Sequence, residues 1–159
     1  GIGQDADGLM RIFRLAELYL NFAEAAYQAV GPDGQVASKV GAEALSARDA
    51  VNKIRVRAGI PALSSGMSKD SFEKRYRNER RVELAFEEHR FFDVRRWKIA
   101  EQHCGMPDRG LNTNATKVED FTPMDLPLPR NFHKGQYLMP IPYQEINKCP
   151  HIVQNPYYN

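Results

Sequence analysis

Proline is unevenly distributed along the chain, and this limits where long helices can form. Eight of the ten prolines lie after Cys104. A proline inside a helix removes a backbone hydrogen bond and clashes with the preceding turn. The sequence therefore predicts a mainly α protein, with helices up to residue 103. An irregular, loop-rich and proline-rich tail with a few short strands is expected over residues 104–159.

Two helices are expected in the first part of the chain. Between Leu9 and Val30, apolar residues recur at spacings of three and four, which places them on one face of a helix. A second stretch with this spacing runs from about Ala42 to Ala58, and its many small residues permit close helix approach. Each stretch is followed by a glycine and a nearby proline, which end a helix.

Residues 9–63 are therefore predicted to form a helical hairpin, with a polar loop from Gly31 to Gly41 between its helices. The hairpin is close in length to the roughly 34-residue tetratricopeptide unit. Because one such unit buries little apolar surface alone, it is expected to stack on neighbours.

A third helical region is expected over residues 68–103. Asp70 with Glu73 three residues later resembles a capping box. The pattern predicts a helix that continues to about Trp97, with a bend near Glu88 and His89.

The tail carries weaker signals. Lys117–Phe121 and Gln136–Met139 are interpreted as short strands, and Tyr143–Asn147 as one helical turn. Cys104 and Cys149 could form a disulfide in an exported protein or remain two free thiols.

Composition argues against several classes of function. The net charge is +2, from 22 basic and 20 acidic residues, which provides little attraction for nucleic acid or an anionic membrane. No apolar run approaches the roughly 18 residues that a membrane-spanning helix needs. Because the chain begins at Gly1 without an initiator Met, we interpret it as part of a longer protein, with any leader upstream.

The segment from Asn78 to Lys98 has the densest pattern, and it reads NERRVELAFEEHRFFDVRRWK. Opposite charges three residues apart lie side by side on a helix, and aromatic residues stand between them. Such charge-laced faces usually hold a structure together. We therefore predict a structural role for this segment's main residues, which are Arg80, Arg81, Glu83, Phe86, Glu87, Arg90, Asp93, Arg95, Arg96 and Trp97.

This segment closely resembles the signature of the SusD/RagB proteins. Three further stretches agree with the family in the same order: RLAELYLNFAEAAYQAV from Arg14, AVNKIRVRAGIPAL from Ala50, and YLMPIPYQEINKCPHIVQNPYYN from Tyr137. Many family members have glycine where this chain has Glu88, and asparagine near Cys149.

The resemblance implies that residues 1–159 are the carboxy-terminal portion of a SusD/RagB-type protein, with tetratricopeptide-like helix pairs. It also implies a lipoprotein on the outer membrane of Bacteroidetes-type bacteria, with a lipid anchor upstream of this chain. Its expected role is polysaccharide utilization: it would bind an oligosaccharide, a polysaccharide or another nutrient at the cell surface. The ligand would pass to a SusC-like TonB-dependent transporter. No cofactor is implied.

Other functions have weaker support. Glu79, Glu83 and Glu87 share one helix face among arginines, which does not provide the two distinct environments of an acid–base pair. We therefore expect no catalytic residues and no enzyme activity; the remaining alternatives are a helical-repeat scaffold for protein partners and a glycosidase. Metal binding lacks the usual ligand spacing. The nearest candidate ligands are His103, Cys104, Cys149 and His151.

Aromatic residues in the tail are the candidate ligand contacts, because aromatic faces stack on sugar rings. The candidates are Phe132, Tyr137, Tyr157 and Tyr158. Packing of the tail onto the helices is the alternative role for these side chains.

Overall fold

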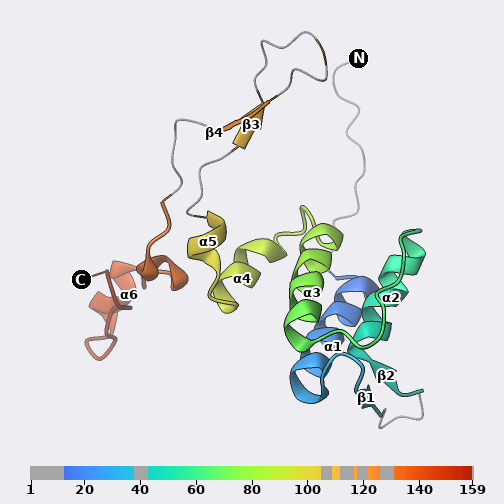
Figure 1. Cartoon of the computed structure of the whole chain (residues 1–159). Helices are drawn as coiled ribbons and strands as arrows, with labels where there is room; N and C mark the ends of the chain where they lie inside the picture. Colours follow the sequence, from blue (N-terminus) through green and yellow to red (C-terminus); the bar gives the residue numbers. More distant parts are fainter. Residues whose placement is uncertain are drawn as a thin grey trace, which may run out of the picture. The chain divides into compact units, whose positions relative to one another are not determined.

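The computed structural model describes residues 13–37, 43–104, 109–111, 117, 122–125 and 131–158. The chain is mainly helical, as the sequence predicts, and divides into two compact units (Figure 1). We call residues 1–87 the helical unit and residues 88–159 the tail unit. Each is described by itself.

The helical unit contains three helices and one small sheet. α1 packs against both α2 and α3, and the β1–β2 pair lies near α1 and α2 (Figure 1). The two strands are antiparallel, with Gln35 opposite Ser46. The elements in chain order are α1 (Leu15–Val30), β1 (Gln35–Val36), β2 (Leu45–Ser46), α2 (Ala47–Arg57) and α3 (Lys69–Glu83).

Serine side chains fix where α2 and α3 begin. Ser46 accepts a hydrogen bond from the Asp49 amide at 3.0 Å, and Ser68 accepts one from the Ser71 amide at 3.2 Å. These bonds satisfy amide groups that would otherwise lack a partner in the first helical turn. The predicted cap at Asp70 is therefore wrong, because Asp70 already lies within α3.

Two further helix boundaries differ from the prediction. α1 begins at Leu15 because Arg14 is extended, with φ −147° and ψ 158°; residues 9–12 lie outside the described ranges. α2 begins at Ala47 and not at about Ala42. Strand β1 lies in the predicted loop, and strand β2 occupies residues that were predicted to begin the helix.

Aromatic rings and small side chains make the core of the helical unit. Tyr27 from α1 meets Phe72 and Tyr76 from α3, with ring centroids 5.4 and 5.5 Å away. Ala23 and Ala47 are fully buried, so the backbones of α1 and α2 can approach closely. Of the stripe predicted for the second helix, Ala47, Val51 and Ile54 lie in the core, whereas the end residues Ala44 and Ala58 are exposed.

The tail unit consists of short elements. In chain order they are α4 (His89–Arg96), α5 (Ala100–Cys104), β3 (Arg109–Leu111), β4 (Pro123–Asp125), the 3-10 helix η2 (Lys134–Tyr137) and α6 (Tyr143–Lys148). β3 and β4 are antiparallel, with Gly110 opposite Met124. The predicted helical turn from Tyr143 is α6, which extends one residue further.

The predicted strand Gln136–Met139 is wrong. His133 caps η2 by accepting a hydrogen bond from the Gly135 amide, and its own amide donates to the Gln136 side chain at 2.8 Å. This reciprocal cap favours a helical turn over an extended strand. The predicted strand Lys117–Phe121 lies outside the described residues, apart from Lys117.

The predicted bend is a full break between α3 and α4. Glu88 stands immediately before α4 with φ +64°, and Phe86 also has φ +64°. A side chain in this left-handed region costs about 1–2 kcal/mol, whereas glycine adopts it freely. This explains why a glycine suits the position that Glu88 occupies.

Candidate ligand pocket and signature residues

A pocket of about 310 Å³ lies in the tail unit, between the start of α5 and the η2 turn. Its volume is at the lower end of the range for small-molecule sites. We call it the tail pocket. Its lining residues are Lys98, Glu101, Lys134, Gly135, Tyr137, Leu138, Pro156 and Tyr157. Two of the four candidate aromatic residues, Tyr137 and Tyr157, are therefore brought together.

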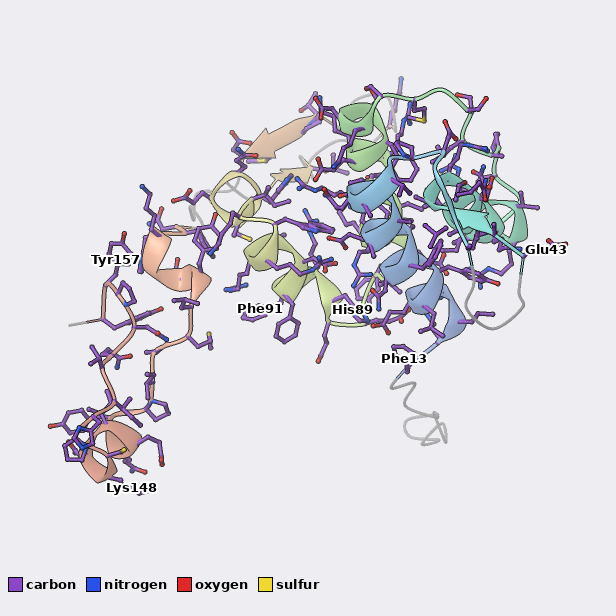
Figure 2. The ribbon with its side chains drawn as sticks, turned by 90° about the horizontal axis from the view of Figure 1, so that it is seen from below. Phe13, Glu43, His89, Phe91, Lys148 and Tyr157 are labelled. Carbon is purple, nitrogen blue, oxygen red and sulfur yellow. The ribbon has the colours of Figure 1, made fainter. Side chains whose placement is uncertain are left out.

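Tyr157 presents the most accessible aromatic ring of the pocket (Figure 2). Its side chain is 69% exposed, and its backbone is left-handed with φ +73°. A Cβ atom on Gly135 would lie 2.9 Å from the Tyr157 Cβ atom and 2.9 Å from the His133 ring. Only glycine fits at position 135 without movement of these neighbours.

Tyr137 is held by contacts on its ring. The Lys98 ammonium lies 4.6 Å from the ring centroid, and the Phe132 ring approaches edge-on at 5.0 Å. The Tyr137 hydroxyl is buried and has no hydrogen-bond partner in the described structure. A buried polar group without a partner is costly, so water or a ligand group would gain by reaching it.

The other two candidates contact the protein. The Tyr158 hydroxyl donates to the Leu138 carbonyl at 3.0 Å, and Phe132 lies beside the guanidinium of Arg95 at 5.5 Å. Neither lines the tail pocket. Both rings are half-buried, and they connect segments of the tail to one another and to α4.

The charged side chains of the pocket were not singled out from the sequence. Among the described residues, Lys98, Lys134 and Glu101 take part in no ion pair. Lys98 also has a left-handed backbone, with φ +56°. Lys98 ends the signature segment, and Glu101 is the one acidic residue three or four positions from it. This scarcity of neighbouring acids could have drawn attention to Lys98 in the sequence.

The signature residues before Glu88 join the helices of the helical unit. Arg14 donates to the carboxylate of Glu87 at 2.8 Å and to that of Glu83 at 2.6 Å. Arg14 also donates to the Glu83 backbone carbonyl. The two carboxylates raise the pKa of the Arg14 guanidinium above its usual value, with Glu87 as the larger contributor.

Glu83 also binds a side chain from α2, and Arg80 joins α3 to α1. Arg57 from α2 donates to Glu83 at 2.6 Å, and Arg80 donates to the Asn21 side chain on α1 at 2.8 Å. The sequence interpretation paired these residues locally, three positions apart. The contacts of Glu83 and Glu87 with Arg14 instead span about seventy residues of chain.

Signature residues after Glu88 join α4 to the tail. Arg95 donates to the Gln136 carbonyl at 3.1 Å, and its guanidinium lies 3.5 Å from the Phe91 ring centroid. Asp93 is buried and accepts a hydrogen bond from Arg96 at 2.9 Å, as its spacing predicts. Arg96 also lies over the Trp97 ring at 4.7 Å. Arg90 lies in α4, half-buried.

The apolar part of the signature is less buried than the sequence suggested. Leu84 and Val94 are in the core, whereas Phe86 is fully exposed and Val82 is 58% exposed. Phe91 projects from α4 with 45% of its surface exposed (Figure 2). Arg81 is also exposed and contacts Asn78 at 2.9 Å.

Other predicted features are also placed by the structure. Cys104 and Cys149 are free thiols. Within the described ranges no group of three potential metal ligands occurs, so the histidines and cysteines near residues 103 and 150 do not form such a cluster. In the part of the chain that the structure describes, no helix is both long and apolar enough to cross a membrane.

Comparison with known proteins identifies the family. The model of the SusD family matches residues 3–158, which is nearly the whole chain. The chain belongs to the SusD family. None of the curated proteins compared matches this SusD-family chain.

Solved structures agree with this assignment. A SusD-like protein (BF3747) from Bacteroides fragilis is 35% identical, with a TM-score of 0.73 over 92% of this chain and 25% of its own. A structure named BT4246 is 37% identical, with a TM-score of 0.72 over 92% of this chain and 23% of its own. A selenomethionine form of BT4246 gives a TM-score of 0.76. This SusD-family chain thus spans about a quarter of the structures that it matches.

Proposed function

We propose that this protein captures a glycan or another nutrient at the bacterial cell surface and delivers it to a SusC-like TonB-dependent transporter. The observation that carries the proposal is the SusD-family match over residues 3–158. The full-length protein would be a lipoprotein held at the outer membrane by an upstream lipid anchor. Its role requires binding and release of the ligand without any chemical step.

The tail pocket supports a binding role. It combines an exposed aromatic ring, Tyr157, with charged side chains that have no ion-pair partner among the described residues. Aromatic faces stack on the apolar faces of sugar rings, and polar groups fix the orientation of sugar hydroxyls. We therefore assign Tyr157 as a glycan contact, with Tyr137 supporting the pocket wall.

The experiment has two readouts on the full-length protein. A tagged form is purified from bacterial membranes to test whether a TonB-dependent barrel copurifies, and the purified protein is screened against oligosaccharides, polysaccharides and peptides. We expect both an associated barrel and a ligand. A protein that bound no ligand in the screen and brought down no barrel would contradict the proposal.

A second candidate function is a helical-repeat scaffold for protein partners. It is favoured by an apolar groove of about 120 Å³ along α1 and α2, lined by Leu15, Ala16, Tyr19, Lys53, Ile54 and Arg57. Leu15 and Val56 are more than half exposed on these helices. Stable protein complexes that include no outer-membrane barrel, together with no ligand binding, would favour this alternative.

A further inference from the structure

The lysines of the tail pocket lack the carboxylate contacts that several arginines of the protein make. Arg14, Arg48 and Arg55 each contact a carboxylate directly, and even the exposed Lys148 bonds to Glu145 at 2.9 Å. Lys98 and Lys134 line the same pocket and have no such partner among the described residues. With Glu101 as the one acidic lining residue, the pocket carries a net charge of about +1.

An aromatic ring contacts the Lys98 ammonium. Its ammonium lies 4.6 Å from the Tyr137 ring centroid, a cation–π distance that holds the group beside the pocket. A lysine held by an aromatic face rather than by a carboxylate keeps its N–H groups available. An anionic ligand group can therefore be bound without breaking an existing ion pair.

Two residues that line the tail pocket have a strained backbone conformation. Lys98 and Tyr157 both have positive φ and both line the pocket, and they are two of the four described residues other than glycine with this conformation. Such conformations persist where the surrounding structure imposes them, and they cluster at binding sites. The strain orients a cation and an aromatic ring toward one cavity.

We propose that the tail pocket binds a sugar residue carrying an anionic substituent, which contacts Lys98 and Lys134 while the sugar ring stacks on Tyr157. This inference rests on the proposed function of saccharide capture. Glu101 accepts hydrogen bonds from the sugar hydroxyls and repels a second anionic group. The anionic substituent is a carboxylate, as in uronic acids, or a sulfate ester.

The test measures binding by calorimetry with matched oligosaccharides. The probes are uronate-containing trisaccharides, the same trisaccharides after reduction of each carboxylate to an alcohol, and sulfated trisaccharides. We expect an anionic form to bind at least about tenfold more tightly than its neutral counterpart, because hydrogen bonds to charged groups are the stronger ones. The two anionic sets distinguish carboxylate from sulfate.

Charge variants assign the preference to the pocket. Lys98→Met and Lys134→Met should each weaken binding of the anionic trisaccharide by about tenfold and leave binding of the neutral form unchanged. Lys148→Met removes the same charge outside the pocket and should change neither. Thermal unfolding of each variant shows that it is folded.

Three results would overturn the inference. Equal affinity for the charged and neutral trisaccharides would refute the anionic preference and leave saccharide capture intact. An equal loss in Lys148→Met would show that net charge, and not the pocket, attracts the anion. Absence of binding by every glycan would reject this inference, and it would reject the proposed function as well if no peptide bound and no barrel copurified.

Discussion

Arg14 contacts two carboxylates in the helical unit, whereas Lys98 and Lys134 in the tail unit contact none among the described residues. The side chains of Arg14 and Glu83 are only 17% and 13% exposed, so this ion pair lies largely away from water. Charges that are paired and shielded fix the arrangement of helices. Charges left unpaired beside a cavity keep their capacity to bind. The helical unit thus uses charged residues for support, and we propose that the tail unit uses them for recognition.

The largest expected effect comes from removing Arg14. Arg14→Met leaves the Glu87 and Glu83 carboxylates without their shared partner, and we expect the free energy of unfolding to fall by about 3 kcal/mol. Chemical denaturation measures this loss. As a control, Glu145→Gln breaks the exposed pair with Lys148 and should cost less than about 0.5 kcal/mol. Equal costs would remove the distinction between shielded and exposed pairs.

Burial of Tyr27 in the aromatic core should make the free energy of unfolding fall at high pH. Burial raises the pKa of the Tyr27 hydroxyl to about 12 from its usual 10. Because the pKa of Tyr27 is higher in the folded protein than in the unfolded chain, the buried neutral hydroxyl favours folding. This stabilisation is fully present below pH 10 and is lost as the pH rises toward 12. The loss is about 2–3 kcal/mol. Denaturation at several pH values measures it, and Tyr27→Phe should flatten that slope; an unchanged slope would contradict the assignment to Tyr27.

Gly135→Ala tests the packing of the tail unit. The added Cβ atom would meet both the His133 ring and Tyr157 at 2.9 Å, so the η2 cap or the pocket wall must move. We expect a cost of about 1–3 kcal/mol and weaker ligand binding. Thermal unfolding and calorimetry report the two effects. A variant with wild-type stability and affinity would show that the pocket wall yields freely.

The smallest expected effect is an increase in the free energy of unfolding. Glu88→Gly removes a side chain from a left-handed position, and we expect the protein to become more stable by about 0.5–1 kcal/mol. Glu88→Ala, which keeps a Cβ atom, should give no gain and serves as the matched control. Chemical denaturation distinguishes them. Equal stability of the two variants would show that strain at this position is negligible.

Local sequence patterns predicted much of the fold. Spacing of apolar residues identified α1 and α2, and Gly31 and Gly59 correctly marked where these two helices end. The family resemblance was confirmed over residues 3–158. Proline density separated the long helices from the short elements that follow them. Each of these signals depends on residues close together in the chain.

Features that depend on distant residues could not be predicted. Spacing placed Glu83 beside Arg80, but nothing local indicates that Arg14 would reach it from the start of α1. The β1–β2 pair was missed because each of its strands is only two residues long. The η2 turn was missed although its cap is local, since His133 and Gln136 lie three residues apart. In the pocket, the aromatic candidates were visible in the sequence, whereas their relation to Lys98 and Lys134 required the fold.

The most direct test of whether the helical unit provides support and the tail unit provides recognition compares two variants. The unfolding temperature and the oligosaccharide affinity of each variant are measured. Tyr157→Gly removes the exposed ring and relieves a positive φ, whereas Arg14→Met removes a structural cation. We predict that Tyr157→Gly weakens oligosaccharide binding by about tenfold without lowering the unfolding temperature. Arg14→Met should lower that temperature and leave the affinity of the folded protein unchanged. The opposite pattern, with affinity lost in Arg14→Met and retained in Tyr157→Gly, would contradict the account.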